Sequence, residues 1–163
     1  MTATADPEMA QELIVDAVNR ASESVFSTML GMAVEAQPPI SEHELELLDG
    51  VVGLIGFTGK WVGTGILFCT DRFACHIGSA MLMHECKQIN ADVLDGIGEM
   101  ANMILGNFKE SMESRTGPLS LSVPTVVYGK NFSTRTPLQA PWVIVPFHLG
   151  EDVFQVRVCI KRK

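Results

Sequence analysis

The stretch that decides the fold is residues 91–113, which read ADVLDGIGEMANMILGNFKESME. On a helical wheel of about 100° per residue, its large apolar residues share one arc and its polar residues share the opposite arc. The apolar arc holds Val93, Ile97, Met100, Ala101, Ile104, Leu105, Phe108 and Met112. The polar arc holds Asp92, Asp95, Glu99, Asn102, Gly106, Lys109, Glu110 and Glu113. The stretch predicts a long helix that buries one face and exposes the other.

The residues before this helix predict two more helices and a hairpin. Pro7 suits the first turn of a helix, and apolar residues then recur at three- and four-residue steps to about Leu30. Two segments rich in Leu, Val, Ile and Phe flank a turn at 58–60, which is typical of a β-hairpin. We expect a helix over 7–30, a connecting loop over 33–42, strands over 44–57 and 61–69, and a second helix over 71–83.

The residues after Gly117 and Pro118 predict strands. Apolar side chains alternate over 154–160, which is the period of a half-buried antiparallel strand. Further strands are expected over 119–127 and 142–149, the latter at an edge or a bulge because Pro146 lacks an N–H donor. The sequence predicts an α+β fold with three helices packed on a mostly antiparallel sheet of about five or six strands. We expect one domain over 1–163, with 1–7 as a flexible leader.

Composition excludes several classes of protein. The chain has 163 residues, of which 47% are hydrophobic, so intrinsic disorder is excluded. Its apolar stretches are too short to span a membrane, and the first ten residues lack the pattern of a signal peptide. The net charge of −7 does not suit nucleic-acid binding. Four cysteines without a disulfide pattern predict free thiols in the cytoplasm.

The exposed face of the 91–113 helix has unusual features. Glu99 lies at its centre, with Asn102 beside it one turn later. Glycine costs about 1 kcal/mol relative to alanine inside a helix, yet three glycines occur here. Of these, Gly106 projects from the stripe of Glu99 and Asn102, and the apolar Met103 is expected nearby on the exposed side. This pattern favours a docking face, although Glu-x-x-Asn often occurs by chance and, taken alone, more often belongs to an ordinary solvated helix face.

Four segments in order resemble the CheC/CheX chemotaxis phosphatases, and CheX more than CheC. Residues 97–103, IGEMANM, resemble the family's signature I-G-E-x-x-N-M, and residues 124–129, PTVVYG, resemble the strand P-T-V-V-x-G that follows it. Residues 55–59 (IGFTG) and 63–68 (GTGILF) resemble the family's first hairpin. The resemblance covers roughly residues 10–162 and implies the same arrangement of helices and strands.

The resemblance implies hydrolysis of the aspartyl phosphate of a CheY-type response regulator in the cytoplasm. It implies that Glu99 and Asn102 are catalytic and that the regulator supplies the Mg2+, so the chain needs no cofactor of its own. We expect Asp95, Met103 and Gly106 to contact the regulator. Positive mean hydropathy and open sheet edges further suggest a homodimer, as CheX-like proteins are similar in pairing through their sheets. No nucleic acid or membrane partner is expected.

The first helix carries a similar pair, Asp16 and Asn19, and CheC-like proteins carry two such pairs. We expect this pair to be inactive, because aspartate is shorter than glutamate and Arg20 lies close enough to neutralise Asp16. No glycine from 14 to 30 opens a gap like Gly106, and Phe26 is expected to crowd the flank.

Two alternatives to a phosphatase stay open on the sequence. One is a noncatalytic interaction module of the same fold, as in flagellar-switch relatives. The other is a metal or small-molecule enzyme that uses residues elsewhere, such as Cys69, Cys75, His76, His84 and Cys86. The spacing of these residues matches no zinc pattern, so we expect no metal site. The glycines over 53–65 form no phosphate-binding loop and are expected to serve the hairpin.

Overall fold

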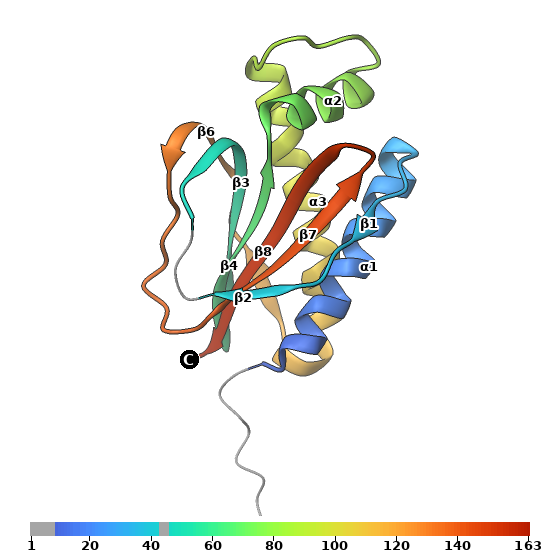
Figure 1. Ribbon diagram of the computed structural model, residues 1–163. Coiled ribbons are helices and arrows are strands. Elements are labelled where there is room, and N and C mark those ends of the chain that lie inside the picture. The colour runs from blue at the N-terminus through green and yellow to red at the C-terminus, as the bar shows by residue number, and fades with distance from the viewer. Residues whose placement is uncertain (1–8, 43–45) are drawn as a thin grey trace, which may run out of the picture.

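The computed structural model describes residues 9–42 and 46–163, which form three helices and eight strands (Figure 1). In chain order these are α1 (Gln11–Leu30), β1 (Glu35–Ala36), β2 (Ile40–Glu42), β3 (Leu48–Gly59), β4 (Trp61–Cys69), α2 (Asp71–Leu82), α3 (Ala91–Thr116), β5 (Leu119–Leu121), β6 (Thr125–Phe132), β7 (Trp142–Leu149) and β8 (Asp152–Arg162). The predicted leader, 1–7, lies outside the described residues. None of the described helices is long and apolar enough to cross a membrane.

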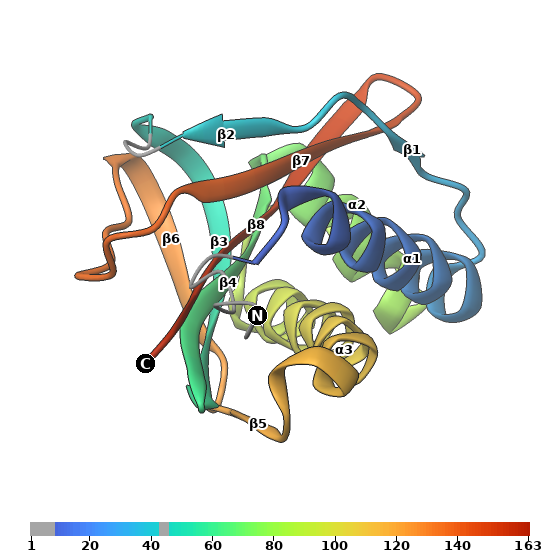
Figure 2. The same ribbon diagram turned by 90° about the horizontal axis from the view of Figure 1, so that it is seen from below.

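All eight strands belong to one sheet, and every pairing in it is antiparallel. The main order is β1-β7-β8-β4-β3-β5, with β2 also paired to β7 and β6 also paired to β3. The sheet curves around the helices, which all lie on its concave side (Figure 2). The predicted fold class is therefore confirmed, but five or six strands was too low a number.

The additional strands are short, and this explains why the sequence did not reveal them. β1 and β2 have two and three residues and lie in the segment predicted to be a loop. Strands of this length show no alternation that a pattern could detect. Both pair with β7: β1 pairs with residues 147–148 and β2 with residues 142–144. Pro146 lies between these two paired stretches, so its missing N–H interrupts no hydrogen bond to β1 or β2.

The segment predicted as one strand over 119–127 forms two strands, β5 and β6, that pair with successive parts of β3. Residues 122–124 connect them. The start of β5 is tied to the end of α3, because Glu113 Oε2 accepts a hydrogen bond from Leu119 N at 3.0 Å. This bond and the ion pair with Lys109 at 3.2 Å lower the pKa of Glu113.

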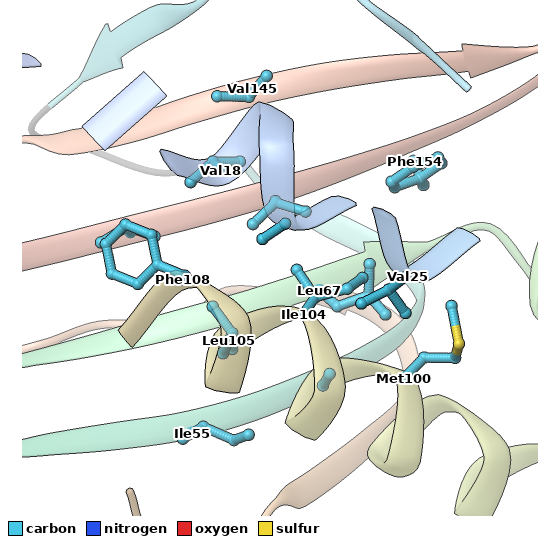
Figure 3. Packing of buried hydrophobic residues seen from close by; sticks show 14 of the residues in the cluster. Val18, Val25, Ile55, Leu67, Met100, Ile104, Leu105, Phe108, Val145 and Phe154 are labelled. Atoms are coloured by element: carbon cyan, nitrogen blue, oxygen red, sulfur yellow. The ribbon is translucent and has the colours of Figure 1, made fainter. Parts of the chain in front are cut away.

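The main core lies between the sheet and the helices (Figure 3). Every residue that the wheel placed on the apolar arc of α3 is at most 2% exposed. Figure 3 shows Ile104 and Leu105 of α3 between Ile55 of β3 and the side chains of α1. Burial of this stripe fixes the rotation of α3 and so turns the opposite stripe outward.

Two strand glycines let α3 lie directly on the sheet. A Cβ atom at Gly53 would lie 2.8 Å from the Ala101 Cβ, and one at Gly65 would lie 2.5 Å from a Leu105 methyl group. Neither position has room for a side chain. The expectation that these glycines serve hairpin geometry was wrong for this pair, since they serve the close contact between helix and sheet.

Candidate active site

Glu99 and Asn102 are both exposed on the outward stripe of α3, as the wheel predicted. Among the residues that the structure describes, neither side chain has a hydrogen-bond or ion-pair partner, so both are available to another molecule. Asn90 Oδ1 caps the helix by accepting from Val93 N at 2.9 Å. The pair thus stands on a rigid, capped helix two turns from its start.

The face around this pair is acidic. Asp92, Asp95 and Glu110 are exposed, and within 9–42 and 46–163 none of them has an ion-pair partner. The nearby cation Lys109 is engaged by Glu113. Because these carboxylates are not neutralised locally, the face attracts a cationic partner.

Asn102 stands between two glycines, with Gly98 one turn before it and Gly106 one turn after it. A Cβ atom at Gly98 would lie 3.1 Å from Val126 Cγ2 and 3.8 Å from Pro124 Cβ, so this glycine lets β6 approach the helix. At Gly106 the nearest atom would be a Leu121 methyl group at 4.0 Å, which leaves room for a methyl group. Only Gly106 therefore leaves the open gap that the sequence suggested.

Met103 differs from its predicted placement. It was expected on the exposed side, but it is half-buried and packs against the main core. A wheel assumes one buried arc, whereas α3 contacts the sheet and also α1 and α2. These neighbours widen the buried arc until it reaches Met103.

The connection between β5 and β6 carries an exposed apolar residue that the sequence analysis did not predict. Val123 is 84% exposed, although it lies between two paired strands and beside residues that touch α3. The only available signal was a valine directly before a proline in a short connection. Such a signal cannot distinguish an exposed side chain from a buried one.

The pair on α1 lies in different surroundings. Asp16 forms an ion pair with Arg20 at 3.2 Å, as predicted. Asn19 is half-buried, and its Oδ1 is buried without a hydrogen-bond partner among the described residues. Phe26, which was predicted to crowd the flank of this pair, is fully buried and stacks on Phe73 and Phe154.

The cysteines and histidines form no comparable site. All four cysteines are free, and burial raises the pKa of Cys69 and Cys159, the latter to about 11. Thiols of high pKa are poor nucleophiles. Across residues 9–42 and 46–163, no group of three or more His, Cys, Asp or Glu side chains is placed to hold a metal ion.

Comparisons with known proteins identify a family for this chain. The family model described as "Chemotaxis phosphatase CheX" matches residues 51–148, which include the hairpin, α2, α3 and β6. The curated "CheY-P phosphatase CheX" of Thermotoga maritima is 28% identical over 123 residues, which are 73% of this chain and 79% of the relative.

Solved structures share the whole fold. The chemotaxis protein CheX from Vibrio vulnificus superposes with a TM-score of 0.81 at 25% identity, over 91% of this chain and 99% of that one. The CheX-CheY-BeF3-Mg+2 complex from Borrelia burgdorferi contains a chain that superposes with a TM-score of 0.77 at 23% identity, over 91% of this chain and 98% of that one. The family model covers more than half of the sequence, so this chain belongs to the CheX family of chemotaxis phosphatases.

Proposed function

We propose that this chain is a hydrolase that removes the phosphoryl group from the aspartyl phosphate of a CheY-type response regulator. The observation that carries the proposal is the exposed pair Glu99 and Asn102, which has no partner within the described chain and stands in the family's signature on α3. The name of the Thermotoga maritima relative, a CheY-P phosphatase, supports the same reaction.

The chemistry of the two side chains suits this reaction. An acyl phosphate is already activated, so catalysis needs a positioned water molecule and stabilised charge more than a covalent intermediate. The Asn102 amide both donates and accepts hydrogen bonds and can hold water in line with the phosphorus. Glu99 pairs with a cationic residue of the regulator, the lysine beside its phosphate, and so fixes the position of Asn102.

The remaining groups are assigned to docking and to the regulator. Asp95 adds negative charge one turn before Glu99, and Gly106 leaves room for the regulator's backbone. Half-buried Met103 contributes its exposed edge. The Mg2+ belongs to the regulator's phosphorylation site, in keeping with the composition of the Borrelia burgdorferi complex, and no residue of this chain is needed to hold it. The reaction takes place where the regulator works, in the cytoplasm.

The alternative is a noncatalytic binding module with the same fold. A binding module needs an exposed face but no particular amide at position 102. The presence of both Glu99 and Asn102, free on the same stripe, favours the phosphatase.

The test is the release of phosphate from phosphorylated receiver domains of the source genome. We expect the wild-type chain to accelerate dephosphorylation of at least one receiver and Asn102→Ala to abolish most of that acceleration. Asn107→Ala is the matched control, because Asn107 is also exposed on α3 but lies off the stripe. If no receiver loses its phosphate faster in the presence of the wild-type chain, the proposal fails.

We further propose that the chain forms a homodimer through its sheet. β6 pairs with β3 on one side only among the described strands, and it exposes Val127 and Tyr128. Open edges of this kind pair readily with another strand. We expect light scattering at micromolar concentration to give the mass of two chains, and the mass of one chain would contradict the dimer.

A further inference from the structure

We propose that Val123 is a specificity-determining contact that packs against an apolar patch of the regulator next to its phosphorylation site. This inference rests on the proposed phosphatase function and extends its docking surface beyond α3. The occupant to which it commits is the receiver domain of the phosphorylated response regulator.

Val123 is held outward by the backbone around it. Ser122 N donates to Gly56 O at 2.9 Å, and Ser122 Oγ accepts from Gly56 N at 2.8 Å. The same hydroxyl donates to Val123 O at 3.1 Å. The two bonds with Gly56 hold the connection to β3, and the third fixes the backbone within the connection, immediately before the 84% exposed side chain. A β-branched side chain on a fixed backbone has few conformations to lose, so its burial by a partner carries little entropic cost.

Val123 also lies on the flank of the catalytic stripe. Its neighbour Pro124 and the following Val126 approach α3 at Gly98, and the preceding Leu121 approaches it at Gly106. These two glycines are one turn before and one turn after Asn102. The connection therefore runs along the Asn102 side of α3, and a molecule that reaches Asn102 passes beside Val123.

Charge and continuity identify the occupant. The stripe beside Val123 exposes Asp92, Asp95 and Glu99 without ion-pair partners among the described residues, so it favours a partner with a cationic group. The proposed regulator brings such a group to Glu99. An apolar rim next to a polar site is a usual arrangement for specificity, because the polar groups orient the partner and the buried apolar group adds affinity.

The experiment is steady-state dephosphorylation of the cognate receiver by Val123→Ser and Val123→Ile. We expect Val123→Ser to raise KM about tenfold, since the burial of a valine side chain is lost, and to leave kcat within about twofold. Val123→Ile keeps a β-branched apolar surface and should keep KM close to the wild-type value. Val153→Ser is the matched control, because Val153 is an exposed valine on β8, three strands away from β6.

Binding measured without turnover separates docking from chemistry. In an Asn102→Ala background, titration with the beryllofluoride-loaded receiver should show affinity about tenfold lower when Val123→Ser is added. Ser122→Ala removes the side-chain half of the clamp and should weaken binding less than Val123→Ser does. Circular dichroism melts should show that all of these variants are folded.

The outcomes distinguish this inference from the proposed function. If the wild-type chain is active and Val123→Ser leaves KM and affinity unchanged, the contact is refuted while the phosphatase stands. A fall in kcat at unchanged KM would also refute it, since the residue would then act on the reaction and not on docking. If light scattering shows that Val123→Ser dissociates a dimer, the occupant is a second copy of this chain and the inference is wrong. Inactivity of the wild-type chain on every receiver refutes the proposed function itself.

Discussion

Two helices of this molecule carry an acidic residue followed three positions later by asparagine, and their surroundings differ. On α3, Glu99 and Asn102 are exposed and have no partner within the described chain. On α1, Asp16 is neutralised by Arg20 at 3.2 Å, and the Asn19 amide oxygen is buried. The same spacing on two helices thus provides one pair that another protein can reach and one that is already engaged or covered.

The difference shows that spacing is a weak indicator of function, because the residues around each pair determine whether another protein can reach it. Asn102 has a glycine one turn before it and one turn after it, and the gap at Gly106 is open. The helix α1 has no interior glycine, and the Asn19 amide oxygen is buried. A catalyst that enters the active site of another protein needs the first arrangement. The following predictions test the contrast in order of expected effect.

The largest effect is expected from Asn102→Ala. Without an amide to hold the water molecule, the catalysed rate should fall by about 10²-fold or more, while affinity for the regulator stays similar. Because Asn102 is exposed, the free energy of unfolding should change by no more than about 0.5 kcal/mol. Phosphate release and denaturant unfolding measure the two quantities. Full activity in this variant would remove the basis for treating α3 as the catalytic helix.

A smaller loss is expected from Glu99→Ala, and of a different kind. Removing the carboxylate should lower kcat/KM roughly tenfold to a hundredfold and raise KM, because a charge-assisted contact with the regulator is lost. Added salt should raise KM for the wild-type chain and have less effect on the variant, since salt screens the same attraction. A KM that stays at the wild-type value would assign Glu99 to chemistry alone.

Gly106→Ala should make the chain more stable and less active. A methyl group at this position meets no atom closer than 4.0 Å in the free chain, and alanine favours a helix by about 1 kcal/mol over glycine. In the proposed complex the same methyl group fills the gap that the regulator enters, so we expect a several-fold rise in KM. Thermal melts measure the change in stability, and steady-state kinetics measure the change in KM. Unchanged kinetics in a stabilised variant would mean that the gap is not used.

The smallest effect is expected from Asn19→Ala. Activity should remain within about twofold of the wild-type value, and Asn19→Ala combined with Asn102→Ala should match Asn102→Ala alone. The buried amide oxygen has no hydrogen bond to lose within the described residues, so stability should change by less than about 1 kcal/mol. If Asn19→Ala removed half of the activity, α1 would carry a second working site, and the proposed difference between the pairs on α3 and α1 would be wrong.

Much of the fold could be predicted because it depends on local periodicity. The predicted helix over 71–83 is α2, with Thr70 Oγ1 capping it by accepting from Phe73 N at 3.3 Å. The segment 142–149 is β7 as expected, and β8 contains the alternating residues 154–160. The prediction that this last strand is half-buried was wrong, because Arg157 and Cys159 on its other face are buried too. Each of these elements is long enough for several repeats of its period, and the turn residues that bound them act locally.

The parts that were missed depend on contacts between segments far apart in the chain. Whether Gly53 and Gly65 serve a turn or a helix depends on where α3 crosses the sheet. The extent of burial of Met103 depends on the helices beside α3. The exposure of Val123 depends on β5 and β6 both pairing with β3. No pattern within one segment contains this information.

The sequence by itself determined which side of α3 faces outward, and therefore that Glu99 and Asn102 reach solvent. The reason is that eight apolar side chains on one arc can be buried only in one rotation of the helix. Only the tertiary structure determined which residues from other segments lie next to Glu99 and Asn102. The clamp between Ser122 and Gly56 joins residues 66 positions apart. It holds the connection that carries Val123 along the side of α3 on which Gly98 and Gly106 lie. Such neighbours are set by the packing of the whole sheet, which minimises exposed apolar surface and unpaired backbone groups across all strands at once.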